Sequence, residues 1–189
     1  MNNDQLKAEA DELMQRCVLA ELLKDYPRWF VGGSYSYDLM CWRDRDVYVL
    51  DPQFDLKRCF DVARELTQRL DAKESRFTNN VSSPPKADEP KGLYWGLKLG
   101  DERKDAWKID LWFLDLPEYE QHQNYSARMR ARLTAETRAA ILEIKQAFWQ
   151  GPEYRDTITS GMIYRAVLDD GVKGIEDFER WRPNRPMRY

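Results

Sequence analysis

The sequence has few of the residues on which common catalytic centres depend. It contains one histidine, His122, which excludes most zinc sites and most Ser-His-Asp arrangements. Its three cysteines, Cys17, Cys41 and Cys59, are odd in number and widely spaced. We therefore expect free thiols in a reducing cytosol rather than a disulfide framework. Any chemistry must depend mainly on carboxylates.

Long hydrophobic runs and an excess of positive charge are also absent. No apolar run reaches the roughly 18 residues of a membrane-spanning helix, so we expect no membrane partner. The chain begins with a charged amphipathic stretch rather than an apolar one, so we expect no secretory signal and a cytoplasmic protein. Thirty Lys and Arg against 33 Asp and Glu give a net charge of -3, which does not indicate a general nucleic-acid binder.

The spacing of hydrophobic residues along the 189-residue chain predicts an α+β protein. Apolar side chains at three- and four-residue intervals predict helices at 6–25, 56–70, 117–132, 135–149, 157–168 and 175–181. A further short helix, capped by Ser34, is predicted at 35–42. β-Branched and aromatic runs predict strands at 29–31, 46–50, 93–99 and 107–114.

The order of these elements predicts a small mixed β-sheet flanked by helices. The last two strands are expected to form an antiparallel hairpin. The proline-containing stretch 78–92 is predicted to be a long loop. We expect residues 1–116 to form the core and residues 117–189 to form a C-terminal helical subdomain.

Three aspartates stand at positions where carboxylates require an explanation. Asp44 and Asp46 begin a predicted strand, and side chains two residues apart on a strand share a face. Asp110 lies in the middle of an apolar strand, where an unpaired carboxylate would cost several kcal/mol. The three carboxylates are therefore predicted to converge on a divalent cation.

A glycine pair precedes these aspartates at the end of the first predicted strand. Gly32 and Gly33 allow the backbone to approach a ligand closely, and Ser34 is expected to open a helix whose N–H groups attract anions. This corner is suited to a polyphosphate. Because magnesium binds through a few carboxylates plus substrate phosphates, the glycine corner and the aspartates form a coherent pair of half-sites.

Four features follow one another along the chain: residues 30–34 (FVGGS), the ten-residue step from Ser34 to Asp44, the Asp44-x-Asp46 pair, and the later apolar strand around Asp110. Together they resemble the DNA polymerase β-like nucleotidyltransferase superfamily. The double glycine followed by serine and a helix is similar to its small bacterial members, including the antibiotic nucleotidyltransferases. The resemblance covers about residues 29–114. It implies a mixed-sheet core, two Mg²⁺ ions held by the three aspartates, and Ser34 near the nucleotide phosphates. The implied reaction moves a nucleoside monophosphate from a nucleoside triphosphate to an acceptor hydroxyl, with Asp110 helping to deprotonate the acceptor.

A small-molecule acceptor is favoured over RNA or protein, because the acidic balance gives no broad basic groove. Three lysines near the hairpin, Lys98, Lys104 and Lys108, are available to meet phosphates, and none can be singled out. One residue departs from the family pattern: Arg45 stands between the two aspartates, where an apolar residue is usual, although strand alternation predicts that it points to the opposite face.

Other interpretations remain open. Arg45 favours a catalytically inactive nucleotidyltransferase-fold module with a binding or regulatory role, for example of the toxin–antitoxin type. A plain structural protein with a helical interaction surface at 135–181 is a third possibility. Taken alone, the glycine pair could be an ordinary turn, and Asp110 could be ion-paired across the hairpin. His122, within the polar stretch 120–124, is predicted to lie on the surface, and the basic tail 180–189 to be solvated.

Overall fold

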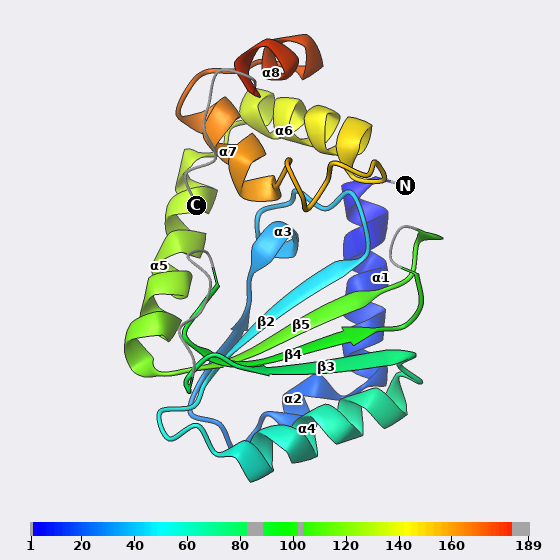
Figure 1. Ribbon diagram of the computed structural model, residues 1–189, viewed down its shortest axis with the longest axis vertical. Coiled ribbons are helices and arrows are strands. Elements are labelled where there is room, and N and C mark those ends of the chain that lie inside the picture. Colours follow the sequence, from blue (N-terminus) through cyan, green and yellow to red (C-terminus); the bar gives the residue numbers. More distant parts are fainter. Residues whose placement is uncertain (1, 83–88, 102–103, 183–189) are drawn as a thin grey trace.

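The computed structural model describes residues 2–82, 89–101 and 104–182. Five strands form one mixed sheet in the order β1-β2-β5-β4-β3 (Figure 1). The central pair, β2 and β5, runs parallel, and every other neighbouring pair runs antiparallel. The strands are β1 (Trp29–Val31), β2 (Asp44–Leu50), β3 (Glu74–Asn79), β4 (Gly92–Lys98) and β5 (Lys108–Leu114). This is the small mixed sheet that the sequence predicts.

Helices cover both faces of the sheet and extend beyond one end of it (Figure 1). Those of the described chain are α1 (Asn3–Arg16), α2 (Leu19–Leu22), α3 (Gly33–Ser36), α4 (Leu56–Arg69), α5 (Leu116–Arg132), α6 (Ala135–Phe148), α7 (Ser160–Leu168) and α8 (Ile175–Trp181). Helices α1, α2 and α4 lie on one side of the sheet, and α3 and α5 lie on the other. Helices α6, α7 and α8 stack together above α3 and continue the side formed by α5.

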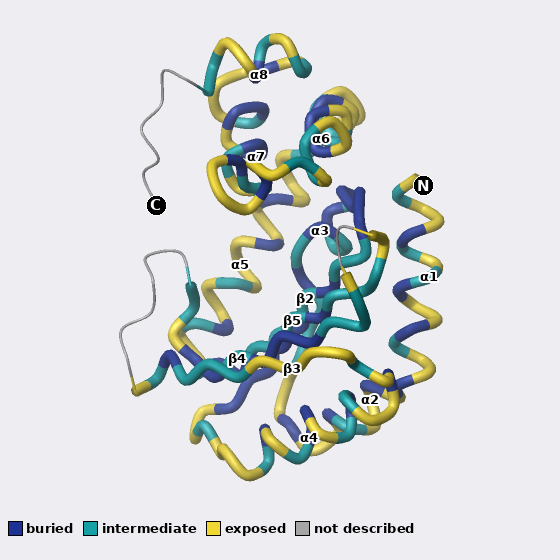
Figure 2. The backbone as a smooth tube through the Cα atoms, turned by 45° about the vertical axis from the view of Figure 1, so that its right-hand side comes forward, coloured by how far each residue is buried: buried dark blue, intermediate teal, exposed yellow. Residues whose placement is uncertain are grey.

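The main core lies between the sheet and helices α1, α2 and α4. Alternate residues of the two central strands are fully buried there, and Figure 2 shows these strands largely in the buried and intermediate colours. They are Val47 and Val49 of β2 and Ile109, Leu111 and Phe113 of β5. Because side chains alternate along a strand, the intervening residues of β2 and β5 face the α5 side. The pattern that builds the core therefore also sets apart a polar face.

A second buried cluster joins the C-terminal helices to the segment that follows α3. Its members come from α5 to α8 and from Tyr37, Leu39, Cys41 and Trp42. The fully buried Lys145 of α6 donates a hydrogen bond from Nζ to the Leu39 carbonyl oxygen over 2.6 Å. The chain between α3 and β2 is thus held by the helical layer.

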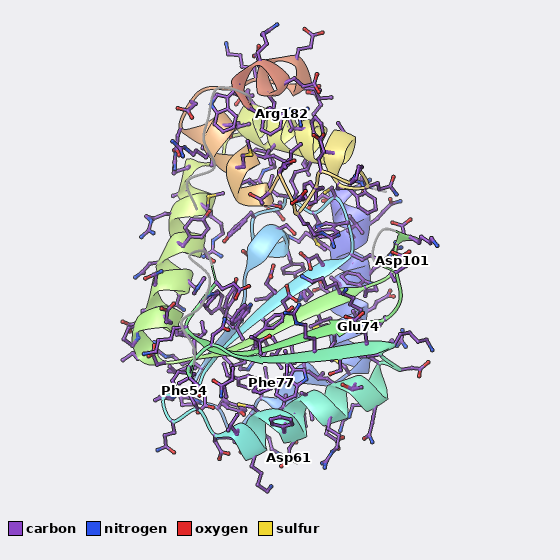
Figure 3. All side chains as sticks on the ribbon, in the orientation of Figure 1. Phe54, Asp61, Glu74, Phe77, Asp101 and Arg182 are labelled. Carbon is purple, nitrogen blue, oxygen red and sulfur yellow. The ribbon has the colours of Figure 1, made fainter. Side chains whose placement is uncertain are left out.

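An aromatic group packs the edge strand β3 onto α4. Phe77 lies between these two elements (Figure 3), with its ring centroid 5.0 Å from that of Phe60 and 4.6 Å from that of Trp95. Ring pairs at these separations add stabilisation beyond the apolar area that they bury. The far side of α4 carries charged residues such as Asp61, as expected for an amphipathic helix.

Several predicted boundaries are wrong. The helix predicted at 6–25 breaks at Val18, whose φ of 49° is left-handed, so that α1 and α2 are separate. The short helix predicted at 35–42 is instead α3, which begins at Gly33 and has no side-chain cap. The predicted loop 78–92 overlaps the ends of β3 and β4, and residues 83–88 lie outside the described ranges. The antiparallel hairpin of β4 and β5 is confirmed.

Two further predictions can be compared with the structure. All three cysteines are free, as expected, and all three are buried. No helix within the described ranges is long and apolar enough to cross a membrane. The predicted solvated tail falls mostly on residues 183–189, outside the described residues.

Candidate functional site

The polar face of the two central strands brings four charged residues into one array. In the parallel register, Asp44 lies beside Lys108, and Asp46 lies beside Asp110. Since residues two apart on a strand share a face, all four side chains project toward the α5 side. The three predicted aspartates therefore meet on one face of the sheet, and a lysine stands among them.

Asp110 has the partners that its mid-strand position requires. The hydroxyl of Tyr94 on β4 donates a hydrogen bond to Asp110 Oδ1 over 2.7 Å. Lys108 Nζ donates to Asp110 Oδ2 and also lies 3.6 Å from Asp44 Oδ1. Lys108 is thus the one of the three candidate lysines that reaches the aspartates, and the cation comes from the same strand as Asp110 rather than from across the hairpin.

The other two lysines near the hairpin have acidic neighbours elsewhere. Lys98 lies 3.6 Å from Glu74, and Lys104 lies 3.5 Å from Asp101.

The array holds more negative charge than its surroundings compensate. Burial raises the pKa of Asp44 and raises that of Asp46 well above its ordinary value, and neighbouring carboxylates raise both further. Burial lowers the pKa of Lys108, but Asp44 and Asp110 outweigh it and hold that pKa well above the usual range. Three carboxylates accordingly share one ammonium group.

The glycine corner lies directly against Asp46. The Gly32 N–H donates to the backbone oxygen of Asp46 over 3.0 Å. Gly33 has a φ of +59°, and a Cβ there would stand 1.8 Å from Asp46 Oδ2. Ser34 is buried, and its Oγ has no hydrogen-bond partner among the described residues. Gly33 is therefore required both by its conformation and by the space that the carboxylate fills.

A pocket of about 670 Å³ opens between this corner and the C-terminal helices. Its walls come from the glycine corner, β2, α5 and the start of α7, and it is lined by Gly33, Ser34, Tyr37, Trp42, Asp44, Asp46, Tyr48, Gln121, His122, Tyr125, Ser126, Arg128, Ser160, Gly161 and Tyr164. Its size and mixed lining are those of a small-molecule or cofactor site. Asp44 and Asp46 line the pocket, whereas Asp110 and Lys108 are not among its lining residues.

Sequence reasoning missed the wall contributed by α5. His122 is not the predicted surface residue: its ring stacks on Tyr48 with centroids 4.8 Å apart, and burial lowers its pKa. Tyr125 and Ser126 line the same pocket. The signal was present as an i, i+3, i+4 spacing, which marks one face of a helix, but polar neighbours in the sequence concealed it.

Arg45 lies on the other face of the sheet, as strand alternation predicts. Its guanidinium carbon stands 3.5 Å from the ring centroid of Tyr35, and its Nη2 atom lies 3.5 Å from Asp11 Oδ1 on α1. The guanidinium therefore does not stand among the aspartates, and the feature that favoured an inactive module does not disturb the array.

The residues at the site fit a divalent cation. Asp44 Oδ1 is a buried oxygen without a hydrogen-bond partner in the described chain, and Asp46 adds a second carboxylate beside it on the pocket wall. Oxygen ligands of this kind suit Mg²⁺. Within residues 2–82, 89–101 and 104–182, however, no three His, Cys, Asp or Glu side chains are already grouped as ligands of one ion.

The sequence itself matches no known family description and no curated protein. Solved structures match in fold. A structure of Cid1, studied for its RNA terminal uridylyl transferase activity, has a TM-score of 0.56 and 18% identity over 89% of this chain and 47% of Cid1. A mutant of the Cid1 poly(U) polymerase bound to MgATP has a TM-score of 0.57 and 15% identity, covering 92% of this chain and 55% of that one.

A third structure, of the same polymerase with Mg 3'-dATP, has a TM-score of 0.55 and 16% identity, covering 92% of this chain and 54% of the polymerase. The chain thus spans about half the length of the solved structures that it matches. At these identities the likeness concerns the fold. The sheet, its helices and the glycine corner agree with the fold that the sequence predicts. This chain has the fold of the DNA polymerase β-like nucleotidyltransferases.

Proposed function

We propose that this protein is a nucleotidyltransferase that moves a nucleoside monophosphate from a nucleoside triphosphate to an acceptor hydroxyl. One observation carries the proposal: Asp44 and Asp46 line a pocket beside the Gly33 and Ser34 corner, with Asp110 next to Asp46 in the strand register. Carboxylates beside a phosphate-sized corner are what nucleotidyl transfer requires. The three free cysteines also support the proposal of a cytoplasmic protein.

In the proposed reaction, the acceptor oxygen attacks the α-phosphorus and forms a new P–O bond. The bond from that phosphorus to the β-phosphate oxygen breaks, pyrophosphate leaves, and the hydroxyl proton passes to a site carboxylate. Gly33 leaves the backbone open to the phosphates, and the unpartnered Ser34 hydroxyl is available to donate to them.

The proposed cofactor is Mg²⁺, held by Asp44 and Asp46 with Asp110 completing the acidic set. When bound, it supplies positive charge to the phosphate oxygens on which negative charge develops. The matched polymerase structures contain MgATP and Mg 3'-dATP, which supports a magnesium-bound nucleoside triphosphate as the donor here.

The proposed acceptor is a small molecule. The Cid1 proteins act on RNA, so they give this choice no support. What supports it is the pocket: among the described residues that line it, Arg128 is the sole lysine or arginine, and a long polyanion requires a basic groove. RNA is therefore the competing acceptor, and an experiment must offer both.

The test incubates the protein with Mg²⁺, the four labelled nucleoside triphosphates, and either a metabolite extract or short RNA oligonucleotides. A mass increase of one nucleotide on a metabolite supports the proposal, whereas extension of the RNA alone identifies RNA as the acceptor. Asp46→Asn should abolish transfer, and Asp61→Asn, on the outer side of α4, should leave it unchanged. Absence of transfer to either pool, with no nucleotide binding by calorimetry, would contradict the enzymatic proposal and favour a non-catalytic module.

A further inference from the structure

The position of Lys108 points to a property of the acidic site that the nucleotidyltransferase fold does not itself dictate. We infer that the Lys108 ammonium group serves as a resident cation between Asp44 and Asp110, so that the site takes one divalent ion rather than two. The inference rests on the proposed function, because it concerns the ions that would assist nucleotidyl transfer.

The first step of the argument is the register. Asp44 and Lys108 are direct neighbours on the parallel strands, as are Asp46 and Asp110. The four side chains form two adjacent rows on the same face, so the ammonium group has a fixed place among the carboxylates. Its side chain is 19% exposed, against 14% for Asp44 and 13% for Asp110, so it is nearly as enclosed as the acids themselves.

The second step concerns the oxygens of Asp110. Oδ1 accepts a hydrogen bond from the Tyr94 hydroxyl over 2.7 Å, and Oδ2 accepts one from Lys108 Nζ. Each donor takes one acceptor site on its oxygen, and the positive charge of Lys108 beside Oδ2 disfavours a second cation at that oxygen. Tyr94 and Lys108 therefore engage Asp110 as a structural anion.

The third step concerns charge and access. Metal ligands must be deprotonated, so with an ion bound the three ionised carboxylates and one ammonium group carry a net charge of about −2, which one divalent ion neutralises. Asp44 and Asp46 line the pocket, and Asp44 Oδ1 has no hydrogen-bond partner among the described residues. These two aspartates are placed to share an ion with substrate phosphates, while Lys108 neutralises the side of the array that faces away from the pocket.

The experiment counts Mn²⁺ ions on the full chain with a saturating α,β-methylene nucleoside triphosphate, which cannot be cleaved at the reacting bond. Equilibrium dialysis gives the number of ions per chain, and electron paramagnetic resonance reports whether two ions lie near each other. Ions about 4 Å apart give an exchange-coupled spectrum, whereas a single ion gives an uncoupled one. We expect one uncoupled Mn²⁺ on the wild type and a second, coupled ion on Lys108→Met.

Two control variants separate charge from general damage. Lys108→Arg keeps the positive charge and should still bind one ion. Lys98→Met removes the lysine that faces Lys108 in the β4–β5 register, where it pairs with Glu74, and should also bind one. Circular dichroism checks that each variant is folded.

Two coupled ions on the wild type would overturn the inference and leave the proposed function standing. A folded Lys108→Met that still binds one ion would also overturn it. If Lys108→Met does not fold, the wild-type spectrum alone decides between one ion and two. Absence of any Mn²⁺ on the wild type would overturn both the inference and the proposed function.

Discussion

At Gly33 the chain leaves β1 with a φ of +59°, and the space where a side chain would begin is filled by the Asp46 carboxylate. Alanine in left-handed backbone costs about 1 to 2 kcal/mol by itself. At this position it would also displace Asp46. We predict that Gly33→Ala lowers the free energy of unfolding by more than that amount and abolishes binding of Mn²⁺ and nucleotide, measured by urea denaturation and calorimetry.

Gly171 is the matched control, because its φ is +72° and no atom lies within 4 Å of a Cβ placed there. Gly171→Ala should show the cost of the backbone conformation alone and leave ligand binding unchanged. Equal destabilisation by the two substitutions, or normal Mn²⁺ binding by Gly33→Ala, would show that Asp46 does not depend on the space beside Gly33.

Gly96 lies opposite Asp110 on β4 and makes room for Tyr94. A Cβ at Gly96 would stand 2.3 Å from the Tyr94 hydroxyl, which is the donor to Asp110. We predict that Gly96→Ala is strongly destabilising in the wild type but costs about 1 kcal/mol less in a Tyr94→Phe background, where the obstructing hydroxyl is absent. A double-mutant cycle by urea denaturation measures this coupling, and additive effects would contradict it.

The sequence predicted the convergence of the three aspartates better than it predicted the residues around them. Asp44, Asp46 and Asp110 could be predicted to converge because an apolar strand does not tolerate a lone carboxylate. The position of Lys108 beside Asp44 could not, since it depends on the parallel register of β2 with β5, which pairs residues 64 positions apart. Helix α5 was predicted as an element, but its contact with Tyr48 through His122 is tertiary, and the spacing of His122, Tyr125 and Ser126 does not indicate which surface that face meets.

Among the elements, α6 has an unusual attachment to the segment that joins α3 to β2. Lys145 is fully buried, and its Nζ donates to the Leu39 carbonyl oxygen over 2.6 Å and to the Tyr164 hydroxyl over 3.3 Å. Arg138 of the same helix donates to the carbonyl oxygens of Tyr37 and Asp38. Since Tyr37 and Tyr164 line the pocket, α6 supports its wall from behind.

We predict that Lys145→Met lowers the free energy of unfolding by about 1 to 3 kcal/mol, because it leaves the Leu39 carbonyl without its donor. Nucleotide affinity should fall as well, since the wall shifts. Lys57→Met is the control: Lys57 is an exposed residue of α4 that pairs with Asp61, and its loss should change stability by less than about 0.5 kcal/mol. Thermal and urea denaturation test the first effect, and calorimetry the second. Unchanged stability in Lys145→Met would show that the buried lysine is dispensable for this attachment.

At the scale of the whole molecule, one of the two largest buried clusters draws residues from both sides of residue 116. The cluster of α5 to α8 is completed by four residues from the first part of the chain, Tyr37, Leu39, Cys41 and Trp42. We therefore propose that the C-terminal subdomain, residues 117–189, is a helical layer whose core requires the segment before β2. The pocket lies where this layer meets the sheet, so both parts of the chain are needed to form it.

The acidic array links the stability of the whole chain to pH and to divalent ions. Burial, followed by the charges of Asp44 and Asp110, raises the pKa of Asp46 well above its ordinary value. The folded chain thus holds this proton more tightly than the unfolded chain, so stability falls as pH rises from the ordinary carboxyl range through the raised pKa. Asparagine does not ionise. Without divalent ions at pH 8, we predict that Asp46→Asn raises stability by about 1 to 2 kcal/mol, a rise in Tm of about 2 to 8 °C.

Divalent ions should reverse that order. A ligand at 100 times its Kd stabilises the folded state by about 2.7 kcal/mol, so Mg²⁺ should raise the Tm of the wild type, and more at pH 8 than at pH 5, where protons compete for the carboxylates. Asp46→Asn should gain much less, because it lacks a ligand. Differential scanning calorimetry of both proteins, with and without Mg²⁺ at pH 5 and at pH 8, measures these differences in Tm. A variant that is less stable than the wild type without ions would mean that Asp46 stabilises the fold through its contacts at the glycine corner, and that the carboxylate is a structural residue rather than one retained for a cation.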